Sequence, residues 1–117
     1  LAILTNKELI AVNQDKLGVQ GFKYTVIDGL EVWVKPLSDN NWAVTFLNKS
    51  EIEKNINFNW KNNNIKDADF GYEANFTTTN YKLTDLWKNK EVGTTKKSFS
   101  GKLGAHDVIT LRLTPLK

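Results

Sequence analysis

Seven aspartates are the residues of this sequence best suited to acid–base chemistry, but their spacing does not define a catalytic pair. They are Asp15, Asp28, Asp39, Asp67, Asp69, Asp85 and Asp107. Most stand in turn-like contexts such as IDGL, LSDNN and AHDV, where an Asp side chain commonly bonds the nearby backbone. Glycoside hydrolysis requires two carboxylates about 5 to 9.5 Å apart in a cleft. Sequence spacing offers no such pair, and we predict no catalytic residue in the chain.

The single histidine, His106, adds little to this chemistry. It precedes Asp107 at the start of the last predicted strand, and neighbouring strand residues point to opposite faces. The sequence contains no nucleophile motif such as G-x-S-x-G. We therefore expect the ring nitrogens of His106 to hold a turn. Since one histidine without any cysteine cannot supply a metal-ligand set, we expect neither a metal site nor a cofactor.

The tryptophans raise the alternative of sugar binding, because aromatic faces stack on the C–H surface of a pyranose ring. Trp42 and Trp60 share their faces with apolar neighbours and are predicted to lie in the core. Trp33 shares its face with charged residues, so it is either an exposed platform or is covered by something outside the sheet. We favour burial of Trp33, because a short helix that we predict at the N-terminus, over residues 6–14, also needs a surface to pack against. Tyr24 is the second candidate platform.

Two glycosylation sequons occur, at Asn48 and Asn75. The chain has 14 Asn and 15 Ser plus Thr among 117 residues, and chance alone predicts about two sequons in such a composition. They carry no information about secretion.

Strand-sized segments with two-residue alternation dominate the chain from Val19 onward. Asp28 and Gly29 form a hairpin signal between the first two. A later strand is expected to carry Tyr81, Leu83 and Trp87 on one side. The segments are 19–27, 30–37, 42–48, 52–60, two within 70–87, 96–103 and 107–115. Seven or eight short strands predict an all-β fold, an antiparallel β-sandwich of Greek-key type.

A short helix is predicted ahead of these strands. Thr5 is a good N-cap, Glu8 completes a capping box, and Leu4 and Leu9 are placed for a hydrophobic staple. The helix should run over residues 6–14, and such a short helix is marginal in water without a partner surface. We therefore expect it to pack against something else.

Charge and hydropathy narrow the classes of partner. The net charge of +3 is spread along the chain, unlike the basic stripe of nucleic-acid binders, so we expect no nucleic-acid partner. No apolar run approaches the ~20 residues that cross a bilayer, so we expect no membrane partner. The absence of cysteine leaves the compartment open, because exported bacterial proteins also often lack it.

Four fragments of the chain closely resemble glycoside hydrolase family 27, the α-galactosidases or melibiases. They are ILTNKELIAVNQDKLGVQG (3–21), LEVWVKPLSDNNWAVTFLNKS (30–50), LTDLWKNKEVGT (83–94) and AHDVITLRLTP (105–115), in the family's order and spacing. The resemblance spans nearly the whole chain, although residues 51–82 match poorly.

The resemblance implies a retaining glycosidase as parent, with a (β/α)8 barrel that hydrolyses terminal α-galactosides and a C-terminal sandwich. Residues 1–17 would be the barrel's last helix and linker, and residues 18–117 the sandwich. The implied partner is the barrel of the same chain. None of the seven aspartates has the family's catalytic surroundings, so the chain alone is predicted to be inactive. A periplasmic or secreted parent is compatible with this family. The alternative is a carbohydrate-binding module that contacts galactosides through Trp33 or Tyr24.

Overall fold

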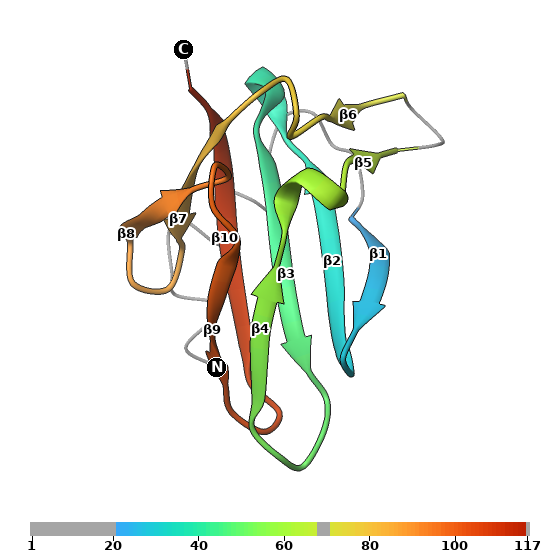
Figure 1. Ribbon diagram of the computed structural model, residues 1–117, viewed down its shortest axis with the longest axis vertical. Coiled ribbons are helices and arrows are strands. Elements are labelled where there is room, and N and C mark those ends of the chain that lie inside the picture. Colours follow the sequence, from blue (N-terminus) through green and yellow to red (C-terminus); the bar gives the residue numbers. More distant parts are fainter. Residues whose placement is uncertain (1–20, 68–70, 117) are drawn as a thin grey trace.

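The computed structural model describes residues 21–67 and 71–116, and these residues form an all-β fold (Figure 1). The predicted helix over residues 6–14 and the domain boundary at residue 17 lie outside the described residues. The strands are β1 (Phe22–Ile27), β2 (Leu30–Pro36), β3 (Trp42–Asn48), β4 (Lys54–Phe58), β5 (Ile65–Lys66), β6 (Glu73–Ala74), β7 (Tyr81–Asp85), β8 (Lys90–Thr94), β9 (Phe99–Leu103) and β10 (Val108–Pro115). Two single-turn 3₁₀ segments, η2 (Ser38–Asn40) and η3 (Trp60–Asn62), complete the described elements.

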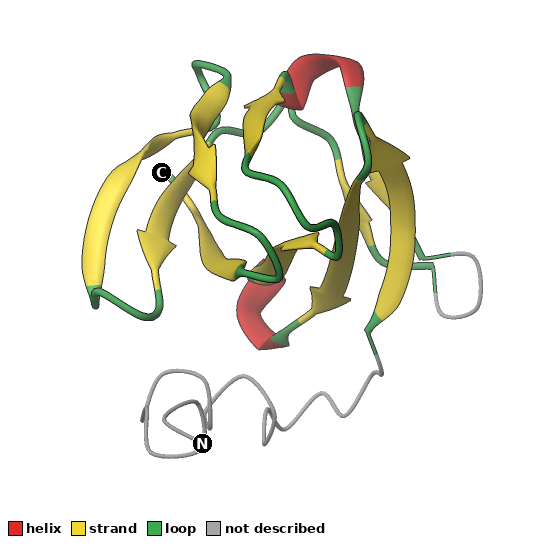
Figure 2. Ribbon diagram, turned by 90° about the horizontal axis from the view of Figure 1, so that it is seen from below, coloured by secondary structure: helices red, strands yellow, loops and turns green. Residues whose placement is uncertain are grey.

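The strands pair antiparallel in three sheets. The six-stranded sheet has the order β1-β2-β3-β10-β7-β8, so the last strand lies between β3 and β7. β4 pairs with β9 and β5 pairs with β6 in two small sheets. Figure 1 shows β4 and β9 in front of the large sheet, and Figure 2 shows the same strands from below. The antiparallel sandwich predicted from the sequence is confirmed.

The core forms where the predicted alternation places apolar side chains. Along β2 the burial alternates without interruption, with Leu30, Val32 and Val34 inside. Along β4 the same rule buries Ile56 and Phe58 and leaves the asparagines outside. Aromatic rings then connect the core in a row of contacts, mostly edge to face: Phe46, Phe58, Trp60, Phe76 and Tyr81 follow one another at centroid distances of 4.8–5.5 Å. Such ring pairs add stability beyond their buried area.

The hairpin between β1 and β2 is closed by the predicted Asp28–Gly29 turn. Both residues have positive φ, 51° for Asp28 and 82° for Gly29. This is the backbone of a type I′ turn, whose twist matches that of the flanking strands. The two residues therefore fix the register in which Ile27 faces Leu30.

Both outer strands of the six-stranded sheet pair irregularly. The β1–β2 register shifts between Lys23 and Thr25, which makes Tyr24 an extra residue. The β7–β8 register shifts between Leu83 and Thr84. Each edge of the large sheet thus carries a bulge.

The structure corrects three details of the prediction. β5 was not predicted, because it has only two residues. β8 was not predicted either, because its residues are almost all exposed and give no apolar alternation. Trp87 does not share the core side with Tyr81 and Leu83, because β7 ends at Asp85 and the chain turns there. Trp87 packs instead against a second apolar cluster of Leu37, Ala43 and Leu86. No helix within the described residues is long and apolar enough to cross a membrane.

Candidate functional site

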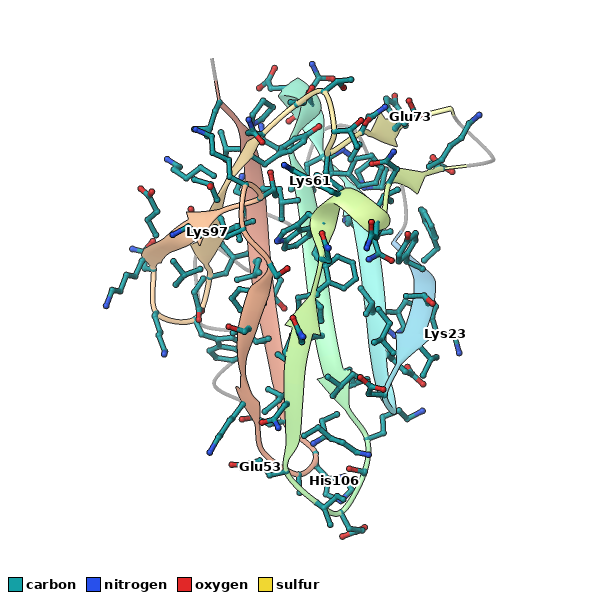
Figure 3. The ribbon with its side chains drawn as sticks, viewed as in Figure 1. Lys23, Glu53, Lys61, Glu73, Lys97 and His106 are labelled. Carbon is teal, nitrogen blue, oxygen red and sulfur yellow. The ribbon has the colours of Figure 1, made fainter. Side chains whose placement is uncertain are left out.

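His106 lies in the turn between β9 and β10, at one end of the sandwich (Figure 3). Its backbone has a φ of 58°. Its N–H donates to the carbonyl of Ser50 at 3.2 Å, and its ring Nε2 lies 3.1 Å from Oε1 of Glu51. Both partners belong to the loop after β3. His106 therefore holds two neighbouring turns together.

Most of the described aspartates stand in turns, as their sequence contexts predict, and the side chains of Asp85 and Asp107 accept hydrogen bonds from nearby backbone N–H groups. Asp28 and Asp39 have positive φ in tight turns, and Oδ1 of Asp107 accepts from the N–H of Val108 at 2.8 Å. Asp67 is buried, and its N–H donates to the carbonyl of Tyr72 at 2.7 Å. Asp15 and Asp69 lie outside the described residues. Across 21–67 and 71–116, no group of three or more His, Cys, Asp or Glu could hold a metal ion.

Asn48 of the first sequon is a structural residue. It is fully buried at the end of β3. Its Nδ2 donates to the carbonyls of Ile52, Leu103 and Gly104 at 2.9 to 3.0 Å, and its Oδ1 accepts from the N–H and hydroxyl of Ser50. Asn48 belongs to a sequon by chance composition, and the fold uses both the nitrogen and the oxygen of its side-chain amide.

Tyr24 and Trp33, the two candidate platforms, stand on opposite sides of the large sheet. The Tyr24 ring packs against the core, and its hydroxyl donates to the carbonyl of Asn64 at 3.2 Å. Burial raises the pKa of this hydroxyl. Trp33 is 39% exposed, and its ring N–H donates to Oε1 of Glu31 at 2.9 Å. The indole ring is therefore partly accessible to solvent, while its N–H group is held by Glu31.

A further site, which the sequence did not single out, lies along the open side of the sandwich. Two cavities of about 390 and 440 Å³ share the lining residues Asp85, Lys88, Lys102 and Ile109, and together they form one groove between the β7–β8 hairpin and β9. We call it the β8–β9 groove. Asp85 is 2% exposed and its Oδ1 accepts from the N–H of Trp87 at 2.9 Å and of Lys88 at 3.1 Å. In the sequence, nothing distinguishes Asp85 from the other six aspartates.

Comparison with known proteins places this fold and these residues in a family. Residues 27–113 match the family described as the α-galactosidase C-terminal β-sandwich domain. Over 114 residues the chain is 40% identical to α-galactosidase A of Cellvibrio japonicus, an alignment that covers 97% of this chain and 28% of that protein. The chain spans about a quarter of the length of the curated relatives it matches.

Solved structures show the same architecture. The sandwich of α-galactosidase I from Mortierella vinacea superposes with a TM-score of 0.73 at 23% identity, over 94% of this chain and 27% of that one. A family 27 β-L-arabinopyranosidase from Geobacillus stearothermophilus gives 0.71 at 25% identity, over 96% and 22% of the two chains. The resemblance to family 27 stated from the sequence is confirmed. This chain belongs to the family of α-galactosidase C-terminal β-sandwich domains.

Proposed function

We propose that this chain is the non-catalytic C-terminal domain of a retaining α-galactosidase and that it packs on and stabilises a catalytic (β/α)8 barrel of the same polypeptide. The proposal rests on how much of this chain and how much of each relative the alignment covers. Almost all of this chain aligns, yet the aligned part accounts for only 28% of the C. japonicus enzyme and 25% of the α-galactosidase of Cyamopsis tetragonoloba. The remaining length is ample for a barrel of about 250 residues.

The described carboxylates support a non-catalytic role. A retaining glycosidase needs two carboxyl groups about 5 to 5.5 Å apart, one as nucleophile and one as acid and base. Asp85 and Asp107 line the same cavity, but each has one oxygen committed to backbone N–H groups of its own turn. Hydrolysis of terminal α-galactosides is therefore assigned to the barrel.

The outer face of the six-stranded sheet is the surface that we assign to the barrel contact. Its register places Ala43 and Trp33 on this face, because their chain neighbours Val44 and Val34 point into the core. The second apolar cluster, Leu37, Ala43 and Leu86, is buried, and the half-buried Trp87 packs against it away from the main core. The exposed indole of Trp33 and the partly exposed Trp87 are the apolar groups that we assign to the contact.

Three proteins test this proposal: the full-length enzyme, the same enzyme ending before residue 18, and the 117-residue chain. Hydrolysis of p-nitrophenyl α-galactoside and the thermal midpoint are measured for each. The chain alone should show no turnover, and the enzyme without it should melt several degrees lower, since an exposed apolar interface destabilises the barrel. Turnover by the chain alone, or an unchanged midpoint after truncation, would overturn the proposal.

A surface substitution locates the contact. Trp33→Glu in the full-length enzyme should lower the thermal midpoint, because a carboxylate would be buried against the barrel. Ile52→Glu is the matched control, since Ile52 is 63% exposed in the loop before β4. Equal midpoints for the two variants would rule out the outer face as the contact surface.

Carbohydrate binding is the second candidate function, and the exposed indole face of Trp33 favours it. Titration of the 117-residue chain with galactose and melibiose measures it directly. Saturable binding at ~1 mM or below that is lost in Trp33→Ala would support a binding module. A flat titration would exclude Trp33 as a sugar platform.

A further inference from the structure

We propose that the β8–β9 groove binds a neutral saccharide, with the carboxylate of Asp85 as the acceptor for its hydroxyl groups. Trp33 does not line the groove. Trp87 lines one of the two cavities and also packs against the second apolar cluster, but the inference rests on Asp85 and on the two glycines of β8 and β9. It does not require packing against a barrel.

Only one of the two carboxylate oxygens of Asp85 is hydrogen-bonded within the fold. Oδ1 caps the turn after β7 through the N–H groups of Trp87 and Lys88. Oδ2 accepts no hydrogen bond within the described part of the chain. It is also not fully enclosed by protein atoms. Asp85 also lines both cavities of the groove. A buried carboxylate oxygen thus faces space in which a donor could sit, and a buried charge gains most from such a donor.

The charges around Asp85 point to hydroxyl groups rather than to an ion. Lys88, Lys97 and Lys102 line the groove together with Asp85 and Asp107, and Figure 3 shows Lys97 beside β8. The ammonium groups oppose binding of a cation, and the buried carboxylate opposes binding of an anion. A hydroxyl group both donates and accepts hydrogen bonds, so it can satisfy a carboxylate and an ammonium group together.

Two glycines open the groove between the sheets. Gly101 pairs with the buried Ile56, and Gly93 pairs with the buried Leu83, so both glycines occupy inward-facing positions. A Cβ atom added at either glycine would meet no atom within 4 Å. At these positions a closed sandwich would carry side chains that fill the interior. Because glycine has no side chain, Gly93 and Gly101 leave room for a ligand in the cavity that Asp85 also lines.

The dimensions and the walls fit a sugar ring. Pockets for small molecules have volumes of about 300 to 1,000 Å³ and combine apolar walls with a few polar groups. Each cavity falls in this range, and Ile109 and the half-buried Trp87 provide apolar lining. Indole and aliphatic surface pack against the C–H face of a pyranose, while Asp85 and Lys88 reach its hydroxyl groups.

Calorimetric titration of the 117-residue chain tests the inference. The probes are galactose, glucose, mannose and melibiose, with sodium sulfate as an anion and calcium chloride as a cation. At least one of the four sugars should bind saturably at ~1 mM or below. Sulfate or calcium binding without sugar binding would overturn the proposal, as would the absence of binding to every probe at 50 mM.

Two variants assign binding to the groove. Gly101→Leu should weaken sugar binding by more than about tenfold because it fills the groove, and it removes no existing side-chain contact. Asp85→Asn should have the same effect, because it keeps an acceptor oxygen for the turn and loses the charge. Trp33→Ala is the control and should bind as the unaltered chain does. Unchanged affinity in folded Gly101→Leu, or loss of binding in Trp33→Ala alone, would overturn the assignment. Circular dichroism of each variant establishes that it is folded.

Discussion

The side-chain amide of Asn48 donates to the backbone carbonyl of Leu103 at 3.0 Å, which ties the end of β3 in the large sheet to the end of β9 in the small one. The same nitrogen also reaches the carbonyls of Ile52 and Gly104. A primary amide has two N–H groups, so at least one of them is shared. One buried side chain thereby holds together the two layers and the two turns at this end of the sandwich.

Asn48→Ala should reduce the free energy of unfolding by about 2 to 4 kcal/mol, because buried carbonyls would lose their donor. Urea denaturation followed by tryptophan fluorescence measures this change. Ser50→Ala is the control and should cost about 1 kcal/mol, since it removes one hydroxyl from the same network. A loss of less than about 0.5 kcal/mol in Asn48→Ala would contradict this account.

Phe58→Ala should cost about 3 to 5 kcal/mol in unfolding free energy. The ring of Phe58 is 2% exposed and lies edge to face against both Phe46 and Trp60, so its removal would leave a cavity in the row of aromatic contacts. The neighbouring Asn57→Ala is the matched control, because Asn57 points to solvent from the same strand. Its effect should stay within about 0.5 kcal/mol. Similar losses in both variants would mean that strand propensity and not packing determines the cost.

Gly29→Ala should destabilise the domain by about 1 kcal/mol, because a side chain at φ 82° is strained. Gly101→Ala should be neutral or stabilising by up to about 0.5 kcal/mol, since its φ is not positive and an added Cβ meets open space. Thermal unfolding of both variants measures the difference. The reverse order of stability would contradict both the turn type and the open groove.

The stability of the domain should fall at acidic pH in part through Glu31. The hydrogen bond from the Trp33 indole lowers the pKa of Glu31 below its ordinary value of 4.5, and Lys49 and Lys23 also lower it, although burial opposes them. Because the folded pKa lies below the unfolded one, the unfolded state takes up the proton first. The contribution of Glu31 is therefore fully present above pH 4.5 and is lost as the pH falls through the folded pKa.

Glu31→Gln removes this titration while keeping an acceptor for the indole. Urea denaturation at about pH 6 and about pH 3 should show a smaller loss of stability in Glu31→Gln than in the unaltered chain. Parallel losses in the two proteins would show that Glu31 does not contribute to the acid sensitivity.

Alternation was enough to predict the inward-facing residues of β2, β3, β4 and β10, because these strands have one face in the core. It was not enough for β8, whose short run Lys90–Thr94 forms a strand through pairing with β7 and not through burial. Trp87 was misplaced for a related reason. A period of two continues only as long as the strand does, and the carboxylate of Asp85 ends β7 by capping the next turn.

The β8–β9 groove could not be predicted from the sequence at all. It depends on Gly93 and Gly101 standing on two strands whose pairing partners were unknown. In a sequence, a glycine inside a strand indicates a bulge or a close approach. Only the registers with Leu83 and Ile56 show that these glycines leave space in the interior. Likewise, Asp85 resembled the other turn aspartates until its burial was known.

The irregular pairing at β1 and β8 also affects how copies of the domain behave toward one another. A flat outer strand offers a row of free N–H and C=O groups on which another chain can add a strand. Here the shift at Lys23 and Thr25 disturbs one border of the large sheet, and the shift at Leu83 and Thr84 disturbs the other. Lys90 and Glu91 add charge along β8. Both edges of the large sheet are therefore poor templates for the addition of a strand from another copy.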